Sequence, residues 1–318
     1  MSPSSHQLAR TWPYPRHRRF VKEVRSAAAA WFRSRGYLVQ EKFAYILADR
    51  DAWPNNILLP EVADYIRTAA ENQRSDGRNF PLHKYVHHGL SSQAMLFNLI
   101  GPLLVRDDLT PLCTALARKG VHWPTGATQA IFEYEDRDVF HEDSGQPTSI
   151  DLVILGSNGS PKIFIESKFV EQEFGGCSVF SAGDCDGRNP AGDHDLCYLH
   201  HIGRTYWSLM EQHGLDQGSV AQDSQCVFAN HYQFFRELLF ALEHGGSFVL
   251  LCDERSPVFY CEGPQGERGL MPYLVTLLPA HLRHRVGSVT VQELVAEIAE
   301  SGNHDWVDDF RIKYGLAE

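Results

Sequence analysis

The chain has 318 residues, a hydrophobic content of 43% and a formal net charge of −11 at pH 7. This length fits one α/β domain with extensions as well as it fits two domains, and the composition supplies enough apolar side chains for a packed core. The acidic balance argues against a protein that coats nucleic acid, although a local basic surface could still bind it. No apolar run is long enough to cross a bilayer, so we expect no membrane partner.

The first 36 residues carry a strong local positive charge, because Glu23 is their one acidic residue. Their basic residues are Arg10, Arg16, Arg18, Arg19, Lys22, Arg25, Arg33 and Arg35. The Ala-rich sequence after Arg18 favours a helix that Gly36 ends. A solvated basic helix and a helix that contacts phosphate groups both fit this pattern, so residues 1–84 are expected to form a basic helical N-terminal region.

The remaining elements alternate between helices and strands. Pro60 suits the first turn of a helix, and Ser91-Ser92-Gln93 suits the cap of an apolar one. Alternation at residues 127–135 predicts a strand with Ile131, Glu133 and Glu135 on one face. We expect helices at 18–35, 60–75, 94–105, 110–119, 196–212, 231–243, 290–300 and 305–314, and strands at 127–135, 247–252 and 273–278.

Residues 148–169 predict a β-hairpin, since two apolar runs flank the turn sequence Gly156-Ser157-Asn158-Gly159-Ser160-Pro161. Side chains alternate across a strand, so Glu166 and Lys168 share one face while Ser167 points to the other. The hairpin can bring Asp151 beside Glu166. Two carboxylates and an amine would then converge at one end of a sheet.

Such a trio suits metal-assisted hydrolysis. Carboxylates are hard oxygen ligands for Mg²⁺, and the bound ion lowers the pKa of a water and stabilises charge on phosphorus. A neighbouring ammonium can orient the water. Asp151 and Glu166 are therefore candidate ligands, Lys168 is the candidate activating group, and the backbone carbonyl of Ser167 is a further candidate ligand.

Asp151, followed after a turn by Glu166-Ser167-Lys168, resembles the signature of the PD-(D/E)XK nuclease superfamily and, within it, a restriction-endonuclease-like family. Ile150 stands where the superfamily name has proline, a structural position. The resemblance spans about residues 85–255 and includes His88-Gly89-Leu90-Ser91-Ser92-Gln93, Phe174-Gly175-Gly176-Cys177 and Tyr232-Gln233 with Arg236. It implies Mg²⁺- or Mn²⁺-dependent hydrolysis of DNA, by water in line with the leaving 3′-oxygen, and a role in restriction or phage defence.

A second group of polar residues could complete this site. Glu133 is preferred over Glu135 because it lies deeper in its strand. Gln93, Gln233 and Arg236 could hold a phosphate or a water. Gln233 and Arg236 are three residues apart on a helix and so share a face, and the resemblance favours Gln233 over Arg236.

The Gly- and Cys-rich stretch at 174–195 is predicted to be a loop, and it suggests a structural zinc site. Cys197 and His201 are four residues apart, a suitable spacing on a helix, and Cys177 and Cys185 could supply two more ligands. Reduced, buried cysteines are the alternative. Cys226 is another candidate ligand, because some nucleases of the superfamily hold an iron–sulfur cluster with four cysteines. Seven cysteines without a secretory signal favour thiols in a reducing cytoplasm.

The sequence therefore predicts an α/β (α+β) fold, with a central mixed sheet flanked by helices in a restriction-endonuclease-like core. The core is expected at residues 85–285, with an insertion at 174–195, and C-terminal helices at 286–318. The expected partner is DNA, with a homodimer or a partner subunit of a defence system. The alternatives are a non-catalytic nucleic-acid-binding or scaffolding module with a zinc-stapled loop, and an RNA nuclease.

Overall fold

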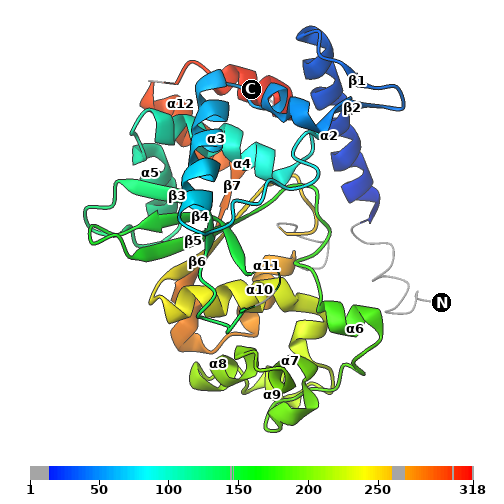
Figure 1. The fold of residues 1–318 in the computed structure, drawn as a ribbon, viewed down its shortest axis with the longest axis vertical. Coiled ribbons are helices and arrows are strands. Elements are labelled where there is room, and N and C mark those ends of the chain that lie inside the picture. The colour runs from blue at the N-terminus through cyan, green and yellow to red at the C-terminus, as the bar shows by residue number, and fades with distance from the viewer. Residues whose placement is uncertain (1–13, 144, 146, 260–268, 303, 317–318) are drawn as a thin grey trace, which may run out of the picture.

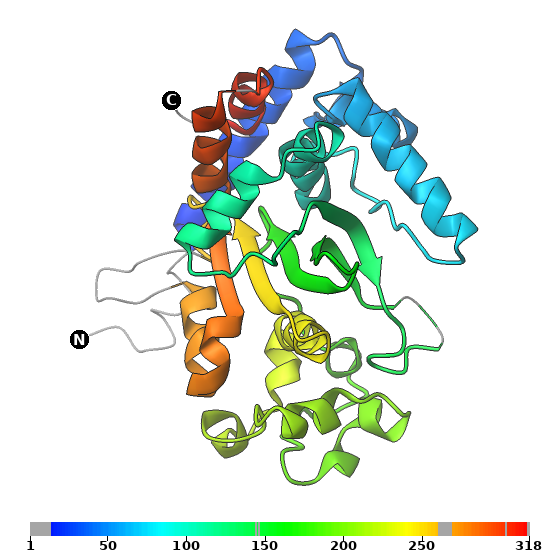
Figure 2. The same ribbon diagram turned by 90° about the vertical axis from the view of Figure 1, so that its left-hand side faces the viewer.

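The computed structural model describes residues 14–316 except 144, 146, 260–268 and 303. Its centre is a five-stranded mixed sheet with helices on both faces (Figures 1 and 2). The strand order follows the chain: β3 (Gln129–Glu135), β4 (Ser149–Leu155), β5 (Pro161–Lys168), β6 (Ser247–Cys252) and β7 (Val286–Thr290). This confirms the expected mixed sheet flanked by helices and the helix expected near the N-terminus of the chain.

The strand directions follow from the connections between them. β3, β4 and β5 are antiparallel neighbours, and the short connection from β4 to β5 is the expected hairpin. β6 is parallel to β5, and β7 is parallel to β6. A parallel neighbour needs a crossover, which helix α10 (Val227–Glu243) provides between β5 and β6.

Each face of the sheet has its own hydrophobic core. Leu152, Ile154 and Ile165 face the first core, whereas Val153 and Phe164 face the second. The first core is covered by α2 (Tyr14–Ser34), α3 (Pro60–Ser75), α4 (Ser92–Val105), α5 (Thr110–Arg118), α12 (Val291–Ser301) and α13 (Val307–Tyr314). The second is covered by α10, α8 (Tyr206–Gln212) and α11 (Leu270–Thr276).

Short elements complete the described chain. A two-stranded ribbon, β1 (Val39–Gln40) and β2 (Phe43–Leu47), was not expected from the sequence. The other short helices are η1 (Arg50–Asn56), α6 (Ser178–Ala182), η2 (His194–Leu196), α7 (Tyr198–His201), α9 (Ser219–Gln222) and η3 (Ala280–Arg285). Within the described residues, no helix is both long and apolar enough to cross a membrane.

Local sequence signals set several helix ends. The hydroxyl of Ser91 accepts a hydrogen bond from the backbone N–H of Ala94, which caps α4 as predicted. Thr290 and Glu293 form a reciprocal capping box at the start of α12. Pro60 occupies the first turn of α3, and Gly36 follows α2 with a φ of 69°.

Four expectations are wrong. Residues 273–278 do not form a strand, because most of this run lies in α11, whose buried Met271 and Leu274 follow helical spacing. The helix expected at 196–212 is broken into η2, α7 and α8. The loop expected at 174–195 contains α6 and the start of η2. Finally, β7 lies beyond the expected core boundary at 285 and pairs with β6, so the sheet includes residues assigned to the C-terminal region.

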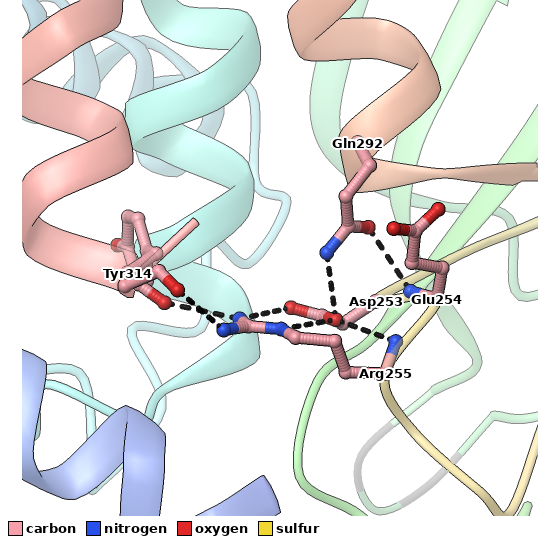
Figure 3. A network of polar contacts seen from close by, with 6 residues as sticks. Asp253, Glu254, Arg255, Gln292 and Tyr314 are labelled. Atoms are coloured by element: carbon pink, nitrogen blue, oxygen red, sulfur yellow. Dashed lines mark hydrogen bonds and ion pairs between the residues drawn. The ribbon is translucent and has the colours of Figure 1, made fainter. Parts of the chain in front are cut away.

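A polar network ties the end of β6 to the two C-terminal helices (Figure 3). The guanidinium of Arg255 donates to both carboxylate oxygens of Asp253, at 2.9 and 2.6 Å, and to the backbone carbonyl of Tyr314 at 3.0 Å. The amide of Gln292 in α12 donates to Asp253 at 2.8 Å. Asp253 is fully buried, so this pairing offsets the cost of burying its charge.

Candidate active site

Asp151 and Glu166 occupy neighbouring strands at the same level of the sheet. Leu152 pairs with Ile165, and the next position along the two strands places Asp151 opposite Glu166. The backbone N–H of Ser167 donates to Oδ2 of Asp151 at 2.8 Å, which fixes that carboxylate against β5. The structure therefore places the two carboxylates side by side, as expected from the predicted hairpin.

Lys168 completes the trio. Its ammonium donates to Oε1 of Glu166 at 2.8 Å and to Oε1 of Gln233 at 2.9 Å. The amide nitrogen of Gln233 donates in turn to Glu166 at 2.6 Å and to Glu237 at 2.8 Å. Alternation along β5 places Glu166 and Lys168 on the same face of the sheet as Phe164, which belongs to the second core. Helix α10 packs on that face, so its side chains reach Glu166 and Lys168.

Glu133 lies on β3, the strand that pairs with β4 on the side away from β5. Its backbone has a φ of 54°, a conformation that non-glycine residues rarely adopt and that costs energy. One carboxylate oxygen accepts a hydrogen bond from Gln93 at 2.6 Å, and the other accepts one from Ser149 at 2.8 Å. The expected strict alternation through Glu133 is therefore wrong. Glu135 is elsewhere, accepting from the N–H of Asn79.

The site holds more buried carboxyl groups than ammonium groups. Burial, followed by repulsion from Glu166, raises the pKa of Asp151 and of Glu237 above their ordinary values. Burial likewise raises the pKa of Glu133 to about 7, although its bonds to Gln93 and Ser149 oppose the rise. Burial disfavours the charge on Lys168, but the surrounding carboxylates outweigh it and hold its pKa above the ordinary value.

Oxygen-rich, negatively charged surroundings of this kind fit a hard divalent cation. One carboxylate oxygen of Glu237 is buried and has no partner among the described atoms, and Asp151 and Glu166 each supply oxygen donors. Within the described residues, no three side chains of His, Cys, Asp or Glu are gathered closely enough to hold one ion. Ligation by Asp151 and Glu166, with the carbonyl of Ser167, stays a prediction.

Two residues differ from the sequence expectation. Arg236 does not contact the trio; its guanidinium lies 5.1 Å from the ring centre of Tyr232. Glu237, which sequence reasoning missed, is fully buried and bonded to Gln233. Its spacing of four residues from Gln233 was the available signal, because residues i and i+4 share a helix face.

The structure gathers the predicted cysteines but not the predicted histidine. Cys177, Cys185 and Cys197 line one cavity, and the fourth cysteine there is Cys226. His201 is exposed and does not line this cavity. It ends α7, only one turn from Cys197.

Comparison with known proteins identifies the family. Residues 25–315 match the family described as "Restriction Endonuclease associating with ARP". The chain belongs to this family. No curated protein and no solved structure matches it. Membership in a restriction-endonuclease-like family agrees with the five-stranded mixed sheet flanked by helices.

Proposed function

We propose that this protein is a nuclease of the PD-(D/E)XK type that hydrolyses DNA phosphodiester bonds with Mg²⁺ or Mn²⁺. The observation that carries the proposal is the strand register that sets Asp151 opposite Glu166, with Lys168 bonded to Glu166. A structural ion pair would need one carboxylate for one ammonium. Here Lys168 faces several carboxylates, which leaves negative charge for a cation to neutralise.

Asp151 and Glu166 would hold the ion, with Glu133 adding negative charge beside them. A bound divalent ion supplies Lewis-acid stabilisation of the phosphorus centre and lowers the pKa of a coordinated water. Lys168 orients the attacking water and offsets the charge of the transition state. Gln233 holds the ammonium of Lys168 and the carboxylate of Glu166 in place, since its amide bonds to both.

The N-terminal helix offers a surface for the DNA backbone next to this site. Phe20 in α2 packs edge-on against Phe169, with ring centres 6.0 Å apart, and Phe169 follows Lys168 directly. Arg18, Arg19 and Lys22 surround Phe20 in sequence and are exposed. Cationic side chains gain affinity by neutralising phosphates and releasing counterions, so this half of α2 suits backbone contact.

The family description names an association with ARP. We propose accordingly that the chain acts beside a partner protein in a cytoplasmic restriction or defence system. A second copy of the chain is the alternative route to cutting both strands of a duplex. Cleavage tests should therefore include the purified chain alone and the chain with its partner.

The proposal is tested by comparing wild type with Lys168→Ala on plasmid, linear and single-stranded DNA, with Mg²⁺, Mn²⁺ or EDTA. Lys162→Ala is the matched control, because Lys162 lies on the same strand but at its other end, bonded to the carbonyl of His244. We expect metal-dependent cleavage that Lys162→Ala retains and Lys168→Ala loses. Preferred cleavage of RNA would redirect the proposal to an RNA nuclease.

A DNA-binding measurement tests the surface on α2 separately. Replacing Arg18, Arg19 and Lys22 together with alanine should weaken binding and reduce the dependence of log Kd on log salt by about 2 to 3, because each phosphate left without its cation lowers the slope by about 0.9. Arg33→Ala, at the far end of α2, should leave both quantities nearly unchanged. An unchanged salt dependence in the triple variant would remove α2 from the interface.

A further inference from the structure

The loop of residues 83–88 carries exposed aromatic and basic side chains beside the candidate active site. His83, Lys84 and Tyr85 are all exposed, and Tyr85 keeps 46% of its surface open to solvent. The run from residue 81 to residue 93 contains no aspartate or glutamate, in a chain whose net charge is −11. The nuclease chemistry proposed above gives this loop no role.

Hydrogen bonds connect the start of the loop to the active site. The side-chain oxygen of Gln93 accepts the backbone N–H of His83 at 2.8 Å, and its amide nitrogen donates to Glu133 at 2.6 Å. Burial lowers the pKa of the His83 imidazole, and the charge of Lys168 is near enough to lower it further. The loop therefore begins at the edge of the candidate active site.

Tyr85 lies within a group of rings and cations. Its ring centre is 5.2 Å from that of His83 and 4.8 Å from that of His88. The ammonium of Lys84 is 4.7 Å from the same ring centre. A ring that its neighbours already hold, and that is still half exposed, loses little freedom when a ligand packs against it.

Buried contacts hold the backbone of the loop. The side-chain amide of Asn56 donates to the carbonyls of Val86 and His88, both at 2.8 Å. Gly89, which follows the loop, packs against α2 so closely that a Cβ there would lie 2.5 Å from that of Ala28. The loop is thus a fixed part of the surface beside α2.

The β1–β2 ribbon lies beside α2 and joins it to the loop (Figure 1). The guanidinium of Arg25, three residues after Lys22 in α2, is 5.1 Å from the ring centre of Tyr45 in β2. The carbonyl of Tyr45 accepts the N–H of Gly89 at 2.8 Å. The exposed cations of α2 and those of the loop therefore belong to one surface that leads to the candidate active site.

We propose that Tyr85 stacks on an unpaired base of the DNA substrate, so that the site acts on single-stranded DNA. Bases within a duplex offer only their edges, because their neighbours in the stack cover both faces, whereas an unpaired base can lay its face on an aromatic ring. Lys84 and Arg25 supply positive charge for the phosphates on either side of that base. The inference rests on the proposed function and names the form of DNA that the site takes.

The test measures binding of the whole chain to a short fluorescent single strand and to its duplex, in EDTA so that no metal-dependent cleavage occurs. Tyr85→Ala should weaken single-strand binding by about 5- to 150-fold, because a stacked base contributes about 1 to 3 kcal/mol and 1.4 kcal/mol is a factor of ten. Duplex binding should be nearly unchanged. Tyr85→Phe keeps the ring and should bind as wild type does. Tyr198→Ala is the matched control, since Tyr198 is 51% exposed but lies in α7.

A second measurement removes the bases instead of the ring. An abasic strand of the same length keeps every phosphate, so Tyr85→Ala should bind it as tightly as wild type does. If Tyr85→Ala weakened binding of the abasic strand as much as that of the ordinary one, or weakened duplex binding equally, the stacking would be overturned.

The proposed nuclease function fails or holds separately. Wild type that binds single strands through Tyr85 but cleaves no DNA with Mg²⁺ or Mn²⁺ would retain the stacking and contradict the nuclease. Metal-dependent cleavage with single-strand binding that Tyr85→Ala leaves unchanged would retain the nuclease and contradict the stacking.

Discussion

Lys313 in α13 should lower the stability of the protein at neutral pH. Its side chain is fully buried, and its ammonium nitrogen donates to the backbone carbonyl of Asn56. No carboxylate among the described residues forms an ion pair with it. The ring centres of Tyr314 and Phe32 lie 5.4 and 6.0 Å away. A desolvated cation–π contact gives about 2 kcal/mol or more, whereas burying an ion without a charged partner costs several kcal/mol.

Burial therefore lowers the pKa of Lys313 well below its ordinary value. Between the folded pKa and the unfolded value of about 10.4, the unfolded chain binds a proton that the folded chain does not, so stability rises with pH by about 1.4 kcal/mol per unit. Lys313→Met removes this dependence. The variant should be more stable than wild type by several kcal/mol near pH 7, less about 1 kcal/mol for the missing bond to Asn56.

Urea unfolding of wild type and Lys313→Met at about pH 8 and about pH 9 measures the effect. The advantage of the variant should shrink by about 1.4 kcal/mol over that unit of pH. Lys22→Met, at an exposed position of α2, should show no such change. A stability difference that does not vary with pH, or a variant less stable than wild type, would refute the reasoning.

Three further predictions concern buried charge and tight packing. Because the pKa of Glu133 is raised to about 7, the folded chain binds a proton that the unfolded chain has lost, and wild type should lose up to about 1.4 kcal/mol of stability per pH unit between about pH 4.5 and about pH 7. Glu133→Gln should not show this loss. Urea unfolding at several pH values checks both. Arg255→Ala should cost about 3 to 5 kcal/mol by leaving Asp253 buried and unpaired (Figure 3), against less than about 1 kcal/mol for Arg78→Ala in an exposed pair, as measured by urea unfolding. Gly246→Ala should cost about 1 to 3 kcal/mol, because a Cβ there would lie 2.6 Å from a backbone carbonyl of β5; a fall in Tm checks this.

The placement of Asp151, Glu166 and Lys168 was predictable because it depends on sequence patterns that span only a few residues. Alternation along each strand and a short turn between them are enough to place Asp151 beside Glu166 and Lys168. A capping signal likewise located α4, and an amphipathic pattern located α12. These features depend on residues close together in the sequence, which is where pattern rules apply.

Other features depend on contacts that no local pattern records. The run at 273–278 is apolar and short, so its period does not separate helix from strand. Glu237 lies among apolar residues of α10. Its spacing from Gln233 indicates a shared helix face, but only the fold shows that this face meets Glu166 and Lys168. Cys226 is far from Cys197 in sequence and reaches the cavity because α10 begins there. The positive φ of Glu133 likewise falls on a residue type that gives no sequence signal for it.

Metal binding tests the central claim most directly, because it does not depend on finding the right DNA substrate or partner. Calorimetric titration of Mn²⁺ or Mg²⁺ should show a site in wild type that Asp151→Asn loses and that Lys162→Ala retains. The ion should raise the thermal unfolding temperature of wild type and leave that of Asp151→Asn unchanged. If wild type bound no ion, or Asp151→Asn bound it equally well, the metal-dependent site at Asp151, Glu166 and Lys168 would be contradicted.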